Sequence, residues 1–417
     1  MRSLLDRILN FDISYLVRGS LWTGLAFLVS ALGSIVTMVA FGNLLSKEAY
    51  GTYNYLLSLA ASLSFLTLSG AGPAVVRAVA RGFEGVAHYA LKLQLKYNSL
   101  AALIVLSSAI YYGYKDNWLF GISLALLALA YPFADAFHIY KEILTGRKRF
   151  DTLAYITNVI TLVGAGVTVL TLYFTGNILI LILIYTAMSL VPNILIYKLV
   201  TRNIKSESKK EELAEFRSTS LHFTGAGIIG VIASYIDRII LFQAAGPVAL
   251  AGYTFALAGP DRLKSLVKNI GSIALPHLAR RSLLQIHDVV YKRILILILG
   301  GLILFGAYWF IAPILFKIFL PRYLDVIFYS QIIASAVIVV PVSVYFGSIF
   351  SAQNMLRAMY IYNLLSHIVR IGLFVILGLM WQIWGLVLAS VLAQGVNAIL
   401  GIIIWEVEYR RLSKNYV

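Results

Sequence analysis

The stretch ILILILGGLILFGAYWFIAPILF at positions 294–316 contains no charged residue. A helix needs about 20 predominantly apolar residues to cross the hydrocarbon core of a bilayer, and this stretch meets that length. Such a segment is typical of a transmembrane helix. We therefore expect the bilayer to determine the fold.

The same criterion, applied outward along the chain, gives twelve segments of this kind. We expect an all-α polytopic membrane protein with about 12 transmembrane helices, at 18–44, 50–76, 94–114, 118–140, 152–175, 178–198, 219–243, 249–278, 293–316, 325–351, 357–380 and 384–407. Positions 1–17 lack the features of a cleaved signal peptide, because Asp6 and Asp12 interrupt their apolar residues. Leu4, Leu5 and Ile8 recur at helical spacing, so we expect an interfacial helix there.

The composition agrees with a membrane protein and excludes several kinds of chemistry. Of the 417 residues 60% are hydrophobic and 12% charged, whereas a soluble domain has about a quarter charged residues. The chain has no cysteine, which excludes disulfides, thiolate metal sites and a cysteine nucleophile. No phosphate-binding G-x-x-x-x-G-K-[ST] loop and no histidine cluster occurs. We expect neither an enzyme nor a bound cofactor or metal.

The basic residues are distributed unevenly between the two sets of connectors. Of the 34 Lys and Arg residues, 25 fall at the N-terminus, the C-terminus and the connectors on the same side as these ends. The opposite connectors hold four: Lys47, Lys115, Lys317 and Arg322. This positive-inside bias predicts an inner (cytoplasmic) cell membrane protein with both termini in the cytoplasm. It also explains most of the net charge of +16 through anionic lipid, so we expect no nucleic-acid partner.

The polar stretch TRNIKSESKKEELAEFR at 201–217 divides six segments from six. Short sequences recur across it: GTY at 51–53 corresponds to AGY at 251–253, and AVAR at 78–81 to HLAR at 277–280. Because each half has an even number of spans, we expect two six-helix lobes related as parallel repeats. The predicted organisation is an N-terminal interfacial segment at 1–17, lobes at 18–200 and 218–408, a cytoplasmic linker at 201–217 and a cytoplasmic tail at 409–417.

Glycines and prolines interrupt several predicted spans. Broken helices are tolerated where neighbouring protein or a wet cavity satisfies the freed backbone groups, although membrane helices are generally richer in both residues. Each position is as plausible a functional hinge as an ordinary feature of a membrane helix. The positions are Gly70-Ala71-Gly72-Pro73, Pro132, Pro192, Pro260, Pro313 and Pro341.

Charged residues inside the predicted spans are the candidate functional residues, because each costs about 2.5–3.5 kcal/mol at mid-membrane on insertion scales. The densest group is in YTFALAGPDRLKSLVKNIGS at 253–272. There Asp261, Lys264 and Lys268 fall on one helical stripe and Arg262 lies beside it. In one interpretation the lysines extend to the cytoplasmic edge and Asp261 pairs with Lys264. In the other the group binds an anion, since a guanidinium grips phosphate bidentately.

The remaining candidates are spread over other spans. Arg370 shares a face with Asn363 and His367, and it either bonds structurally between helices or contacts substrate. Asp237 lies near the outer end of the seventh span, and Asp135 and His138 share a face of the fourth. These three are candidates for coupling to protons or sodium. An interfacial ion pair with Arg238 also explains Asp237, and a satisfied buried pair also explains Asp135 and His138. Arg18 and Arg77 mark cytoplasmic mouths and are candidate anion contacts that the positive-inside bias also explains.

Two stretches resemble a known superfamily. PDRLKSLVKNIGSIALPHLARR at 260–281 is similar to the eighth span of the multidrug/oligosaccharidyl-lipid/polysaccharide (MOP) exporters, and in particular to the ADRL…LPSLS pattern of the lipid II flippases. LLSKEAYGTYNYLLSLAASLSFLTLSGAGPAVVRAVAR at 44–81 resembles the polysaccharide-exporter pattern of the first half. The resemblance extends over nearly the whole chain through the order and spacing of the spans.

This resemblance implies a MATE-like flippase that moves a lipid-linked phosphorylated oligosaccharide to the outer leaflet by alternating access through a cationic cavity. Asp261 and Arg262 match the acidic-basic pair of the lipid II flippases, whose arginine lies in the central cavity. The first span departs from that type, because Gly33-Ser34 stands where an arginine-aspartate pair is found, and the two additional C-terminal spans are missing. Both departures favour the polysaccharide-exporter branch.

Alternatives remain at this stage. A cation-coupled multidrug exporter of the same superfamily is expected to have an acidic cavity with aromatic faces, which the surplus of basic residues disfavours. A membrane glycosyltransferase or polymerase generally has large outer loops with catalytic carboxylates, and the outer connectors here are short. Protons, sodium or the membrane potential are all open as energy sources, as are the sugar and the oligomeric state.

Overall fold

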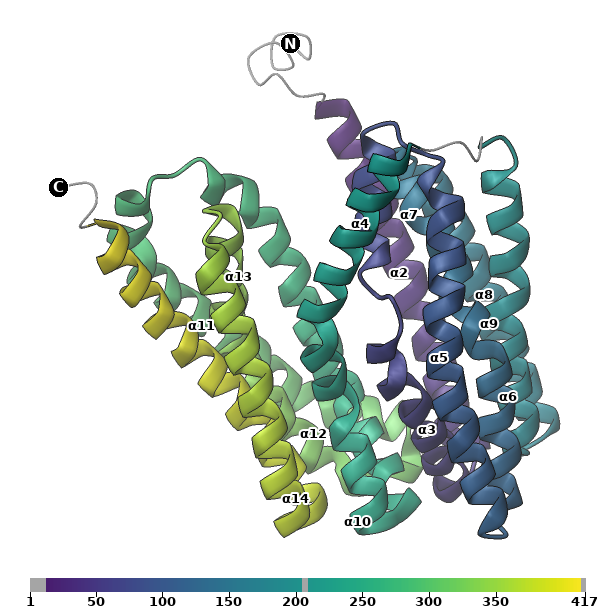
Figure 1. Ribbon diagram of the computed structural model, residues 1–417. Coiled ribbons are helices and arrows are strands. Elements are labelled where there is room, and N and C mark those ends of the chain that lie inside the picture. The colour runs from purple at the N-terminus through teal and green to yellow at the C-terminus, as the bar shows by residue number, and fades with distance from the viewer. Residues whose placement is uncertain (1–12, 205–208, 414–417) are drawn as a thin grey trace. The chain divides into compact units, whose positions relative to one another are not determined.

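The computed structural model describes residues 13–204 and 209–413, and all regular elements within these ranges are helices (Figure 1). The predicted all-α class is confirmed. Residues 1–12 of the predicted interfacial segment, 205–208 of the linker and 414–417 of the tail lie outside the described residues. The α-helices are α2 (Ile13–Leu44), α3 (Lys47–Ser62), α4 (Ala71–Ala80), α5 (Val86–Tyr114), α6 (Trp118–Ala134), α7 (Ile139–Gly146), α8 (Phe150–Phe174), α9 (Ile178–Thr201), α10 (Lys210–Ala279), α11 (Leu283–Phe319), α12 (Ile327–Ala334), α13 (Val340–Ala352) and α14 (Leu356–Ser413). Four 3₁₀ segments join them: η1 (Leu63–Leu66), η2 (Ala136–His138), η3 (Pro321–Val326) and η4 (Ser335–Ile338).

Within the described ranges, eight helical segments are long and apolar enough to cross a membrane, or nine when one bent pair is counted as a span. The chain is therefore a multi-pass membrane protein. One of these eight helical segments lies in α10 and another in α14, and each covers two of the predicted spans. The first predicted span lies within α2. The number of twelve spans stays a prediction.

Both long helices contain a sharp turn of the chain. Gly246 in α10 has φ 81° and ψ −177°, and Gln382 in α14 has φ 49° and ψ −123°. The Tyr253 hydroxyl lies 3.1 Å from a carboxylate oxygen of Asp237, although 16 residues of straight helix would separate the two by about 24 Å. The chain therefore reverses at Gly246, where the positive φ suits a glycine.

The second predicted span is broken at its glycines. The helical stretch Lys47–Leu66 ends before the glycines, and the next helix begins at Ala71. The Gly70 amide donates to the Thr224 hydroxyl at 3.0 Å, which supplies a partner to a backbone group that the break frees. A Cβ atom at Gly70 would lie 2.3 Å from the Ser220 carbonyl oxygen, so only glycine allows this approach of the backbones.

The other prolines differ in their effect. α6 ends two residues after Pro132, and Pro341 stands at the beginning of α13. Pro192 and Pro313 lie inside continuous helices, as does Pro260, although α10 turns elsewhere. These three positions are therefore not helix ends, and their role as hinges stays a prediction.

The chain divides into two compact units. Unit 1 comprises Met1–Leu45 and Leu63–Ile228, and unit 2 comprises Ser46–Ser62 and Ile229–Val417. The helix α3 is thus counted with the later helices, and the first part of α10 with the earlier ones. The predicted boundaries of the lobes and linker stay a prediction.

Unit 1 is built around pairs of long helices. α5 packs along α6, α2 along α8, and the short helix α4 against α7. One core cluster of unit 1 contains buried residues of four helices: Val75 and Val79 of α4, Ala90 of α5, Ile143 of α7 and Tyr197 of α9.

Unit 2 packs α11, α12, α13 and α14 together. Its largest core cluster contains Ile286, Val290, Phe346, Phe350 and Trp405, all fully buried. α3 joins this unit through Tyr55, whose ring stacks on Phe242 at 3.8 Å between centroids and whose hydroxyl accepts from the Gln243 amide at 2.8 Å.

Candidate functional site

The charged stripe of α10 lies in unit 2, on the part of the helix that follows Gly246. Asp261 and Lys264 form an ion pair of 3.2 Å, as expected for residues three apart on one face of a helix. The Lys264 side chain is 14% exposed and that of Asp261 54% exposed. This pair therefore matches the simpler of the two interpretations. Arg262 and Lys268 are both exposed beside it.

Arg370 on α14 presents a cation in a different environment. Its guanidinium carbon lies 5.1 Å from the centre of the Phe374 ring, and its Nε atom is buried with no hydrogen-bond partner. No carboxylate of the described residues lies within ion-pairing distance of it. The Arg370 side chain is half-buried, and its buried Nε atom is left without compensation for the loss of water. Arg370 therefore retains both charge and hydrogen-bonding capacity for an anion.

Asp237 is the buried acid of the same unit. Its side chain is 4% exposed and makes no ion pair within the described part of the chain. One carboxylate oxygen accepts from the Arg238 backbone amide at 2.9 Å and the other from the Tyr253 hydroxyl at 3.1 Å. Hydrogen bonds to the charged form stabilise it where solvent is excluded.

Tyr253 brings the buried acid and the buried base together. The tyrosine is fully buried, and both Asp237 and Arg370 lie close enough to its hydroxyl for electrostatic interaction. Asp261, the first residue of the charged stripe, also interacts with it. α10 also lies close to α14 at Gly230, where an added Cβ atom would lie 3.0 Å from the His367 Nε2. The structure thus brings three predicted residues, Asp237, Arg370 and Asp261, into one neighbourhood.

The other predicted residues lie in unit 1 and belong to separate groups. His138 and Asp135 are 3.8 Å apart, one turn from each other, where α6 passes into η2. For Arg18 on α2 the structure describes the backbone only. The proposed roles of these residues stay predictions.

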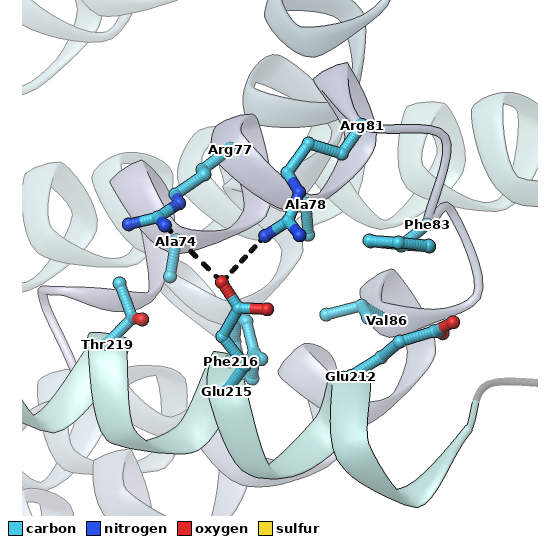
Figure 2. Close-up of a pocket in the computed structure, with 10 residues that line it drawn as sticks. All are labelled: Ala74, Arg77, Ala78, Arg81, Phe83, Val86, Glu212, Glu215, Phe216 and Thr219. Atoms are coloured by element: carbon cyan, nitrogen blue, oxygen red, sulfur yellow. Dashed lines mark hydrogen bonds and ion pairs between the residues drawn. The ribbon is translucent and has the colours of Figure 1, made fainter.

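Arg77 belongs to a pocket between α4 and the first turns of α10, which Figure 2 shows. Arg81 and Arg77 both point at the Glu215 carboxylate, with nitrogen-oxygen distances of 2.7 Å and 3.4 Å. Glu212 also lines the pocket. Because the Glu215 carboxylate lies against both guanidinium groups, the two arginines already have a protein partner.

A second ion pair of unit 1 lies outside the membrane-spanning segments. Two Arg147 nitrogens donate to the two Glu84 carboxylate oxygens, each at 2.7 Å. These bonds hold the pKa of the Glu84 carboxyl below its ordinary value and raise that of the Arg147 guanidinium. The pair joins the loop between α4 and α5 to the loop between α7 and α8, so it is structural.

Tyr253 and Glu215 are the residues that the sequence analysis missed. Tyr253 belongs to the AGY repeat at 251–253, which was used only to relate the two halves, and its aromatic side chain is typical of any span. Glu215 lies in the polar stretch that separates the halves and appears there as one of several exposed charges. Among the described residues no group of three or more His, Cys, Asp or Glu side chains could hold a metal ion.

The geometry and the chain trace define a membrane transporter fold. The chain resembles the lipid II flippase MurJ in an inward closed conformation, with a TM-score of 0.70 and 14% identity over 92% of this chain and 87% of that one. It also resembles a MATE family multidrug resistance transporter of the MOP superfamily in its inward-facing conformation (TM-score 0.66, 13% identity, 93% and 96% of the chains) and in its outward-facing conformation (0.63, 15%, 96% of each). At these identities the likeness shows the fold alone.

The family follows from the sequence. The profile of the family "Polysaccharide biosynthesis protein" matches residues 16–280, which is more than half of the chain. The chain therefore belongs to this family and has the fold of the MOP superfamily, as the resemblance implied. Both the family and the structural neighbours are of transporters and flippases, not enzymes. No curated protein sequence matches the chain.

Proposed function

We propose that this protein is a flippase that moves a polyprenyl-(pyro)phosphate-linked oligosaccharide from the cytoplasmic to the outer leaflet for glycan biosynthesis. The observation that supports it most directly is Arg370, a half-buried residue whose buried Nε has no partner, in the unit that also holds the exposed Arg262 and Lys268. In a family of polysaccharide biosynthesis, a phosphate is the anion that such groups would take.

The proposed mechanism is alternating access through a cationic central cavity in the inner (cytoplasmic) membrane, with both termini in the cytoplasm. The isoprenoid tail stays in lipid, so that only the phosphorylated headgroup must lose water. Paired guanidinium contacts compensate that loss. Arg262, Lys264, Lys268 and Arg370 are the proposed headgroup contacts, with Arg18 and Arg77 at the mouth and Asp261 positioning its neighbours. Asp237, Asp135 and His138 are the proposed residues for coupling to protons or sodium, and the membrane potential also acts on the cavity charges.

The test uses proteoliposomes with a fluorescently labelled polyprenyl-pyrophosphate oligosaccharide and an impermeant quencher, which reports the fraction that crosses. Arg262→Ala is expected to abolish translocation and to leave insertion and folding intact. Arg357→Ala removes an exposed arginine from the beginning of α14 and is the matched control, with translocation near that of the wild type. Near-normal translocation by Arg262→Ala would contradict the proposed function.

A cation-coupled multidrug exporter is the alternative, and the buried Asp237 supports it, because an acid without an ion pair within the described residues suits an organic cation or a coupling proton. Uptake of a lipophilic cation by the same vesicles under a proton or sodium gradient, together with no movement of the labelled lipid, is the result that would favour it.

A further inference from the structure

On the first turns of α10, charged side chains lie on two different faces of the helix. Glu212, Glu215 and Thr219 point toward α4 and line the pocket with Arg77 and Arg81 (Figure 2). These positions are three and four residues apart, as on one side of a helix. Glu215 is therefore paired within the protein, whereas the Glu212 carboxylate accepts from the Lys209 backbone amide and Glu211 is exposed.

Another stripe of the same helix lines a groove of about 570 Å³ together with Tyr89 of α5. The volume is in the range of small-molecule sites. The helical residues recur at spacings of three and four and share one face: Lys210, Leu213, Ala214, Arg217, Ser218 and Leu221. None of the described residues that line the groove is acidic.

The two cations of the groove are open to a ligand. Lys210 and Arg217 are exposed, and neither makes an ion pair with any residue that the structure describes. They are seven residues apart, which corresponds to about 10 Å along the helix. The long side chains of both residues reach into that interval, so one phosphate group fits between their ends.

Leu221, the last residue of the groove along α10, falls at the beginning of the predicted span 219–243. Leu221 at this end is 40% exposed, and Phe223 just beyond it is 42% exposed. Exposed apolar side chains on a span face lipid tails. Lys210 stands at one end of the groove and Leu221 at the other, with Leu213 and Arg217 between them, so that both cationic and apolar side chains are available to a phospholipid.

We propose that this groove binds an anionic phospholipid of the leaflet on the basic side, with the phosphate between Lys210 and Arg217 and an acyl chain along Leu221. Hydroxyls for hydrogen bonding come only from Tyr89 and Ser218 among the described lining residues. This sparse set suits a small headgroup better than an oligosaccharide. The site is separate from the transported lipid and does not depend on the proposed function.

The test is a titration of the full-length protein in neutral detergent with dioctanoyl phosphatidylglycerol, followed by the change in intrinsic fluorescence or thermophoresis. Basic residues near a membrane surface contribute about 1 kcal/mol each, so the double variant K210A/R217A should bind about thirtyfold more weakly. The matched control K198A/R202A removes the same charge from exposed positions at the end of α9 and should change binding less than about threefold.

A second variant retains both cations. Ser218→Glu places a carboxylate in the groove and should weaken phosphatidylglycerol binding while leaving the thermal midpoint of the lipid-free protein unchanged. Equal weakening by both double variants would overturn the proposal, because it would indicate diffuse charge attraction. So would equal binding of dioctanoyl phosphatidylcholine, tighter binding of a polyprenyl phosphate, or full displacement by inorganic phosphate at equal concentration.

Discussion

Arginines at the basic edge of unit 1 and the arginine inside unit 2 have opposite surroundings. Arg81 and Arg147 each bond a carboxylate at 2.7 Å from another part of the chain and stay partly exposed. Arg370 lies against a phenylalanine, and its buried Nε has no partner. Edge charges with protein partners connect helices, whereas a lone interior cation adds no stability in the absence of a ligand.

The acids follow the same division. Glu84 and Glu215 bond arginines near water, whereas Asp237 is 4% exposed and its carboxylate has a tyrosine and a backbone amide as partners. A site for an external ion or headgroup needs charges that the protein itself leaves unneutralised. From this comparison we expect ligand-binding charges in unit 2 and structural ion pairs at the edge of unit 1.

For the comparison of edge and interior charges, the largest expected effect is that of Arg370→Ala on translocation. Removing one partner of a desolvated charge contact typically costs 2–5 kcal/mol, so translocation should fall at least about thirtyfold. Arg370→Lys should recover only part of it, because an ammonium does not bind bidentately. The measurement is the proteoliposome assay described above, with the amount of folded protein measured by size-exclusion chromatography.

The matched control is Arg81→Ala, which removes an arginine of similar size that already has a carboxylate partner. It should lower translocation less than about threefold, since exposed pairs contribute about 0–1 kcal/mol. Similar losses in both variants would remove the distinction between edge and interior arginines.

The next effect concerns the stability of unit 2. Tyr253→Phe removes the hydroxyl that donates to Asp237 and leaves a buried carboxylate oxygen without that donor. The loss is expected to be about 2 kcal/mol, because hydrogen bonds to charged groups contribute about 1.5–3 kcal/mol. Tyr308→Phe is the control: its hydroxyl is paired with that of Ser330 at 2.7 Å, and a bond between neutral groups contributes about 1 kcal/mol. Thermal midpoints in detergent compare the two, and an equal decrease would contradict a stronger hydrogen bond to Asp237 than to Ser330.

Hydropathy predicted the helices well because the bilayer imposes one requirement on every span. The predicted segment 293–316 lies inside α11, which begins at Leu283. The helix begins earlier because Ser282 and Gln285 form a capping box and its polar first turns continue beyond the apolar part. Pro192 and Pro313 did not end their helices, since neighbouring groups in a membrane protein tolerate the missing hydrogen bond.

The site was only partly predictable. Arg370 and Asp237 could be selected from the sequence because charges within apolar segments are costly. Their common neighbour Tyr253 could not, since it approaches Asp237 only through the reversal at Gly246. Likewise, the sequence placed Arg77 at a cytoplasmic mouth without a partner. Its pairing with Glu215 depends on a contact between segments that are far apart in the chain.

The smallest effect is the pH dependence of the Glu84–Arg147 pair. The Glu84 pKa is lowered in the folded protein, so the pair stabilises the fold above the ordinary glutamate pKa and loses this contribution as the pH falls through the lowered value. Because the Glu84 side chain is 36% exposed, solvent screening limits the contribution to about 0.5–1 kcal/mol. The difference in thermal midpoint between the wild type and Glu84→Gln should be largest near pH 7 and disappear in acid. Asp116→Asn, at an exposed turn with positive φ, should show no such difference at any pH. A difference for Glu84→Gln that persists at pH 3 would show that the side chain acts through packing, and the edge pair would then no longer serve as the electrostatic counterpart of Arg370.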